Sequence, residues 1–106
     1  MVRLIHAVVA TMNTDLRALW DAHREAGWPS MAISREGELM TLDTVVSGCA
    51  LYFFDSDETL DPPRIDMLQA CLAELDDLLP ELSGESIDYF GRLRMLAELL
   101  LKTTKC

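Results

Sequence analysis

Apolar residues recur every three or four positions in three long stretches of the chain, which is the spacing of one buried face of a helix. The first stretch predicts a helix over residues 3–26, followed by Gly27 and Pro29 as helix-ending residues. Two shorter helices that divide at Asn13-Thr14 are an alternative, because the Thr14 hydroxyl could cap the second one. The apolar row consists of Ile5, Val9, Met12, Leu16, Leu19 and Trp20, with His23 at its end.

Residues 62–82 carry the most regular pattern. Pro62 and Pro63 suit the first turn of a helix, where a missing N–H group costs nothing, and Pro80 is expected to end or kink the helix near Leu79. We expect the two middle leucines of its apolar stripe to be buried. The stripe consists of Ile65, Leu68, Leu72, Leu75, Leu79 and Leu82.

The third stretch predicts a last helix within residues 83–106. Ser83 or Ser86 is expected to cap its start, and Lys102 and Lys105 lie near its end, where basic side chains complement the helix dipole. Apolar residues surround more than one face, which predicts a central place in a bundle or a seam between copies of the chain. These residues are Tyr89, Phe90, Leu93, Met95, Leu96, Leu99, Leu100 and Leu101.

The region between the first two stretches is less regular. The segment "MAISREGELMTL" could form a small hairpin that turns at Glu36-Gly37. Residues 42–54 fit a helix capped by Thr41 or Asp43, although their composition fits a buried strand equally well. We favour the helix because the flanking segments are helical. The chain of 106 residues is thus expected to form one mainly α domain, a bundle of about four helices with an irregular or small hairpin insert after the first helix.

Charge and cysteine content narrow the function classes. The chain has 18 acidic and 9 basic residues and a net charge of −9, so it should repel nucleic acid and anionic membranes. Its three cysteines show no Cys-x-x-Cys spacing, which favours a reducing cytoplasm over a disulfide framework. No apolar run approaches the length of a membrane span. The first residues have a base and an apolar patch, as a signal peptide would, but the patch is short, carries a His and lacks an Ala-x-Ala end, so we expect no signal peptide.

The stretch "FFDSDETLD" resembles the nucleophile motif of the haloacid-dehalogenase-like phosphatases. The resemblance implies that Asp55 would attack phosphorus and Asp57 would act as general acid and base, with Asp76 and Asp77 as a metal-binding pair. Both lysines follow that pair, whereas the family places its lysine before it. The family fold also needs a parallel sheet, and the residues after Asp61 read as helices. We therefore expect no enzyme activity.

The sequence gives little support for a calcium-binding loop or for a metal or catalytic site built from cysteine or histidine. The acids fit the spacing of a calcium loop, but Leu60 stands where its sharp turn needs glycine. The loop positions would be Asp55, Asp57, Thr59, Asp61 and Asp66. His6 is expected at a core boundary and His23 on a helix surface. Cys49 and Cys71 are expected to be packed thiols and Cys106 an exposed one, so no metal or cofactor is expected.

The acids themselves are concentrated in one segment. Residues 55–88 hold 11 acids and a single base, Arg64. Either this is a solvated surface that confers solubility, or it is a field that attracts a basic partner. Central aromatic side chains usually provide most of the affinity of an interface. Candidate anchors are Trp20, Trp28 and Tyr89, although both Trp residues could equally lie in the core. The residues expected to bind a partner are Asp55, Asp57, Glu58, Asp61, Asp66, Glu74, Asp77 and Trp28.

A small, acidic, single-domain chain of this kind resembles the immunity proteins of bacterial contact-dependent inhibition and other polymorphic toxin systems. The resemblance rests on size, acidity and compactness over the whole chain. It implies a cytoplasmic protein that binds a cognate toxin domain, often a nuclease, and blocks it. Another acidic regulator, such as an inhibitor that mimics nucleic acid, is the alternative.

Overall fold

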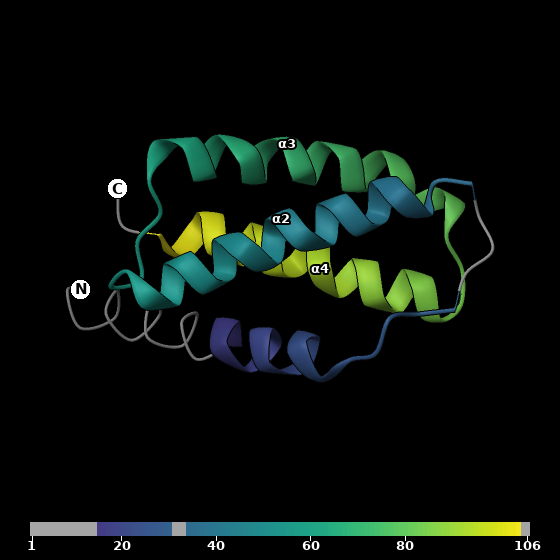
Figure 1. The fold of residues 1–106 in the computed structure, drawn as a ribbon, viewed down its shortest axis with the longest axis horizontal. Coiled ribbons are helices and arrows are strands. Elements are labelled where there is room, and N and C mark those ends of the chain that lie inside the picture. Colours follow the sequence, from purple (N-terminus) through teal and green to yellow (C-terminus); the bar gives the residue numbers. More distant parts are fainter. Residues whose placement is uncertain (1–14, 31–33, 105–106) are drawn as a thin grey trace, which may run out of the picture.

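The computed structural model describes residues 15–30 and 34–104, and the described helices form a four-helix bundle. A first helical segment covers residues 15–25 and is followed by α2 (Glu36–Asp55), α3 (Pro62–Leu78) and α4 (Glu85–Thr103). In Figure 1, α3 and the first helical segment lie along opposite edges of the molecule, with α2 and α4 between them. No strand occurs in the described ranges. The predicted mainly α bundle is therefore confirmed.

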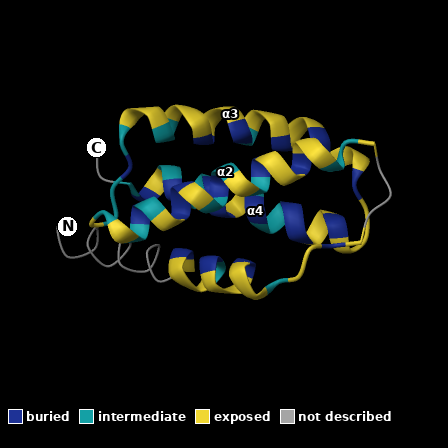
Figure 2. Cartoon of the chain, viewed as in Figure 1, coloured by how far each residue is buried: buried dark blue, intermediate teal, exposed yellow. Residues whose placement is uncertain are grey.

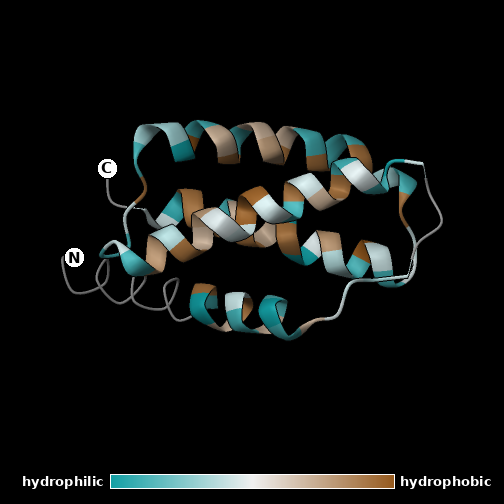
Figure 3. Cartoon of the chain, in the orientation of Figure 1, coloured by the Kyte–Doolittle hydropathy of each residue, from teal (hydrophilic) through white to brown (hydrophobic). Residues whose placement is uncertain are grey.

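The first helix is described only in its second half. Residues 3–14, including His6, lie outside the described residues, as does the alternative break at Asn13-Thr14. Leu16 and Trp20 are buried, as the apolar row predicts. Figure 3 shows that the hydrophobic residues of this segment face α2 and α4. None of the helices within 15–30 and 34–104 combines the length and apolar character that a membrane crossing needs.

The predicted hairpin at Glu36-Gly37 is wrong, because α2 begins there. Its N-cap is Arg35, with no side-chain cap, so the predicted caps Thr41 and Asp43 are wrong as well. Glu36 and Glu38 lie in the first turn, where negative charge favours a helix. The buried stripe also starts earlier than expected and makes one continuous helix more stable than a hairpin. Its members are Leu39, Leu42, Val46, Cys49, Ala50 and Phe53.

Helix α3 begins and ends as its prolines predict. The Asp61 side chain caps its start by accepting a hydrogen bond from the Arg64 N–H (3.1 Å). After Leu78 the chain tightens into a short 3₁₀ turn, η1 (Leu79–Glu81), which contains Pro80. Only the phase of the stripe was misjudged, since Leu72 is partly buried and Cys71 is buried instead. The buried residues of α3 are Leu68, Cys71, Leu75 and Leu78.

Helix α4 is central, as its broad apolar surface predicts, and packs against both α2 and α3. Its N-cap is Gly84 with φ 58°, so the predicted Ser83 and Ser86 caps are wrong. A positive φ is the reason a glycine suits this position. Met95, by contrast, is exposed, so the apolar surface is not wholly buried. In Figure 2 the buried residues of the bundle face inward, while the outer side of α3 is exposed.

Candidate functional site

The motif at the end of α2 is a helix-ending turn. The Glu58 N–H donates to the Phe53 carbonyl (2.9 Å), which is the bond of a Schellman motif. Asp57 occupies the left-handed position of that motif with φ 54°, and Glu58 follows with φ 59°. Because residues up to Asp55 are helical, the strand that a phosphatase nucleophile requires is absent at this point. Asp57 therefore has a structural explanation.

Asp61 also has a structural role, because its carboxylate caps α3 and pairs with a base. Beyond capping α3, it forms an ion pair with Arg64 (2.6 Å), whose guanidinium lies 3.8 Å from the Tyr52 ring centre. The neighbouring Leu60 is buried, and its N–H donates to the Thr104 hydroxyl (2.7 Å), which fixes the loop to the end of α4. No group of three or more potential metal ligands occurs among the described residues.

Five of the acids expected to bind a partner form two exposed groups. Asp55 and Asp57 lie at the loop, and Asp66, Glu74 and Asp77 lie on the outer side of α3, a set that we call the α3 acidic face. None of these five forms an ion pair with a base in residues 15–30 or 34–104. Two neighbouring acids differ, because Asp76 pairs with Arg94 and Glu81 with Arg35.

One residue of the α3 acidic face, Asp77, is placed unfavourably for its own helix. The C-terminal end of a helix carries partial negative charge, so acids there lower stability and bases raise it. The last turn of α3 contains no base but does contain Asp77. Asp77 is also three residues from Glu74, a spacing at which like charges repel. Local helix stability therefore does not explain Asp77.

Trp28 is not brought together with the α3 acidic face. It follows the first helical segment, and its hydrogen bond and ring contacts are with α2 and α4 rather than with α3. Its side chain is 41% exposed, and its indole N–H donates to Glu36 (2.9 Å). The indole ring also meets Tyr89 and Phe90 edge-on, each with 5.5 Å between ring centres. Of the three expected anchors it is the exposed one, since Trp20 and Tyr89 are buried.

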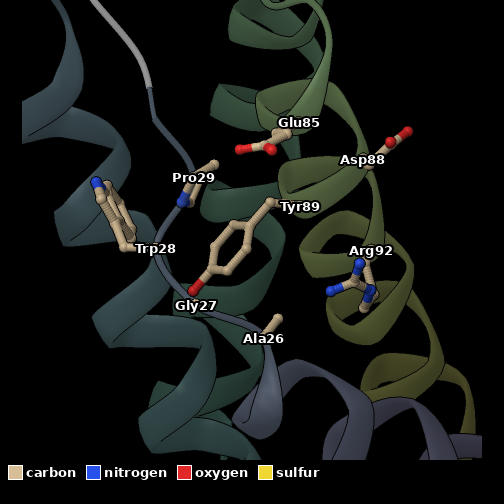
Figure 4. A pocket seen from close by; sticks show the side chains of 8 residues that line it. All are labelled: Ala26, Gly27, Trp28, Pro29, Glu85, Asp88, Tyr89 and Arg92. Carbon is tan, nitrogen blue, oxygen red and sulfur yellow. The ribbon is translucent and has the colours of Figure 1, made fainter.

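An open pocket of about 420 Å³ lies beside Trp28. Loop residues 26–29 form one wall, and four side chains from the first two turns of α4 form the other: Glu85, Asp88, Tyr89 and Arg92. In Figure 4 the Tyr89 ring lies between the Glu85 carboxylate and the Arg92 guanidinium, while Asp88 is turned away. The pocket thus combines aromatic surface with charged groups of both signs.

A buried polar cluster holds Tyr89 in place. His23 Nε2 lies 2.6 Å from one oxygen of Asp43, and the Tyr89 hydroxyl donates to the other (3.1 Å). The cluster joins the first helical segment to α2 and α4, and the His23 and Tyr89 ring centres are 4.8 Å apart. Burial raises the pKa of Tyr89 to about 12, and the Asp43 charge contributes in the same direction.

Sequence reasoning missed this cluster. His23 was expected on the surface, yet it is 4% exposed, and its Nδ1 is buried without a partner in the described structure. Two signals could have found it. His23 continues the apolar row through Trp20, and Asp43 is the one charged residue between positions 39 and 54. A buried acid needs a partner, and a histidine on a buried face can supply one.

The two cysteines within the described residues show no sign of reactivity. Cys49 and Cys71 are free and buried, as expected. Burial raises the pKa of both thiols, that of Cys71 to about 11, so little thiolate forms at neutral pH. Cys106 lies outside the described residues.

The described side chains therefore offer two surfaces for recognition, the α3 acidic face and the pocket beside Trp28. The acids of the first attract cations, and the rings of the second can cover an apolar or planar group. Comparison of the chain with protein-family models, curated proteins and solved structures found no match.

Proposed function

We propose that this chain binds and neutralises a basic protein, and more specifically that it is an immunity protein blocking a cognate toxin domain. The observation that carries the proposal is the α3 acidic face. Its three carboxylates are exposed and have no basic partner among the described residues, and one of them, Asp77, opposes the dipole of its own helix. Acids that lower stability are easily replaced, so their presence is explained if a partner uses them.

A basic protein fits this face better than other partners do. A net charge of −9 repels nucleic acid and anionic lipid, whereas it attracts a Lys- or Arg-rich surface over long range. Asp66 and Asp77 are about 16 Å apart along the helix axis, which is long enough to meet several basic residues. A cleft in which a nuclease holds its substrate has this basic character.

The immunity role adds a biological setting to this binding activity. Size, net acidity and compactness support it, as does a bundle that presents carboxylates on a rigid helix. A fixed helix keeps the charges in place before binding, which reduces the entropy lost on association. Asp55 and Asp57 would extend the same field around the end of α2, while Asp61 contributes less because Arg64 neutralises it.

The test uses the product of the adjacent reading frame as the candidate toxin. Cells that express this product should stop growing, and co-expression of the present chain should restore growth. The variant D66N/E74Q/D77N should associate with the purified toxin about tenfold more slowly at low salt, with a smaller difference at high salt.

The matched control is D15N/D21N/E25Q, which removes three exposed acids from the opposite edge of the molecule. It changes the net charge equally but should alter the association rate much less. Absence of rescue would reject the immunity role. Equal slowing by both variants would show that net charge, rather than the α3 acidic face, governs association.

A further inference from the structure

The pocket beside Trp28 has a negative surrounding despite its one guanidinium. Glu85 and Asp88 line it, and two further carboxylates, Glu36 and Asp43, hold its aromatic side chains from behind. Neither Glu85 nor Asp88 pairs with a base among the described residues. Among the residues that line the pocket, the two carboxylates Glu85 and Asp88 stand against the single base Arg92, which leaves a net negative lining that favours a cation.

The aromatic side chains of the pocket are fixed before any ligand arrives. Trp28 is held by its hydrogen bond to Glu36 and by edge contacts with Tyr89 and Phe90. Tyr89 is held by its hydrogen bond to Asp43 and by the His23 ring behind it. A large indole that stays 41% exposed although it is held this firmly is suited to contact a partner.

We propose that this pocket binds an arginine side chain presented by the protein partner. The inference rests on the proposed function, since it supplies a specific contact to a basic partner. A guanidinium is planar, stacks on aromatic rings and forms two parallel hydrogen bonds with one carboxylate. Trp28 offers the exposed ring surface, Tyr89 contributes the small part of its ring that lines the pocket, and Glu85 offers a carboxylate near the Tyr89 ring (Figure 4).

Arg92 gives the pocket a direction. Glu85 and Arg92 are seven residues apart on α4, about 10 Å along the helix axis. That separation exceeds the screening length of about 8 Å at physiological ionic strength, so a cation at the Glu85 end feels little repulsion from Arg92. The bound guanidinium is therefore expected beside Glu85, and Arg92 would weaken binding modestly.

The direct test needs no partner protein. N-acetyl-arginine amide is titrated into the protein, and the two indole N–H signals are followed by nuclear magnetic resonance. The Trp28 signal should move, because its ring lines the pocket, while the signal of the buried Trp20 serves as an internal reference. N-acetyl-citrulline amide has nearly the same shape without the charge and should produce little change. N-acetyl-lysine amide should bind more weakly than the arginine compound.

Three variants should change the dissociation constant of the arginine compound differently: one raises it, one lowers it and one leaves it unchanged. E85Q should raise the dissociation constant of the arginine compound about two- to fivefold, the range for a pair at a partly exposed rim. R92Q should lower it, since a repulsive charge is removed. E74Q removes the same charge as E85Q from the α3 acidic face and should leave it unchanged.

Weaker binding of the arginine compound to R92Q would overturn the proposal, because it would mean that Arg92 contributes to binding instead of opposing it. Equal shifts with citrulline or lysine compounds would also overturn it, as would an unmoved Trp28 signal. These outcomes are separate from failure of the proposed function, which depends on the α3 acidic face and on the toxin. Loss of toxin binding in D66N/E74Q/D77N would not test arginine binding at Trp28. Loss of arginine binding in E85Q would not test whether the α3 acidic face binds the toxin.

Discussion

At the scale of single residues, the turn after α2 holds a non-glycine residue in an unfavourable backbone conformation. Asp57 adopts φ 54° at the end of α2, a region that costs an ordinary residue about 1–2 kcal/mol and costs glycine almost nothing. Aspartate is among the residues that tolerate this region best. The same residue in a sequence motif had suggested an acid–base catalyst, and the backbone geometry gives it a simpler role.

Replacing Asp57 by glycine should therefore stabilise the protein by about 0.5–1 kcal/mol, because the left-handed position no longer strains a side chain. Urea unfolding followed by circular dichroism would measure the change. D57V should destabilise the fold, since a β-branched residue fits this region poorly. D55G is a matched control two residues earlier, at the last residue of the helix, and should give no such gain because Asp55 has no positive φ for glycine to relieve. If D57G lowered the free energy of unfolding, the Asp57 carboxylate would stabilise the turn by more than the strained backbone of Asp57 destabilises it.

At the scale of elements, helical spacing predicted more than turn chemistry did. The apolar stripes predicted α3 and α4 correctly. Pro62 and Pro80 marked the limits of α3, because the proline ring fixes its own φ angle and removes an N–H donor whatever the neighbouring helices are. The start of α2 was missed, since a Glu-Gly pair after an irregular segment resembles a hairpin turn. Gly37 is tolerated there because it lies on the exposed side of the helix. The order of burial within α3 depends on how the helix is rotated against its neighbours, and one helix's sequence does not specify that.

The rotation of α3 can be tested with two leucines. Leu75 is fully buried and Leu72 only partly, although the sequence stripe treated them alike. L75A should lower the free energy of unfolding by about 2–5 kcal/mol, the range for a buried leucine that leaves a cavity. L72A should cost clearly less, because part of its side chain already contacts water. Urea denaturation of both variants gives the comparison, and equal costs would contradict the rotation seen here.

At the scale of the whole molecule, the sequence predicted an acidic surface but not how its charges are shared. Ion pairs between distant segments, such as Arg35 with Glu81 and Arg94 with Asp76, remove some acids from that surface. Such pairs depend on which helices become neighbours, and their members are 46 and 18 positions apart. The fold also separates Trp28 from the α3 acidic face. The single predicted interface is divided between two surfaces, one on α3 and one formed by loop residues 26–29 and the start of α4.

The excess of negative charge should also be measurable in the stability of the whole molecule. D66N/E74Q/D77N should raise the free energy of unfolding by about 0.5–1 kcal/mol at low salt, because it relieves the repulsion between Glu74 and Asp77 and that between Asp77 and the C-terminal end of the α3 dipole. The gain should shrink as salt is added, since these charges are exposed and screened. D76N is the matched control, one residue from Asp77, and should give no gain because it breaks the pair with Arg94. If the triple variant were less stable than the wild type, the acids would support the fold itself. The argument that a partner explains them would then lose its basis.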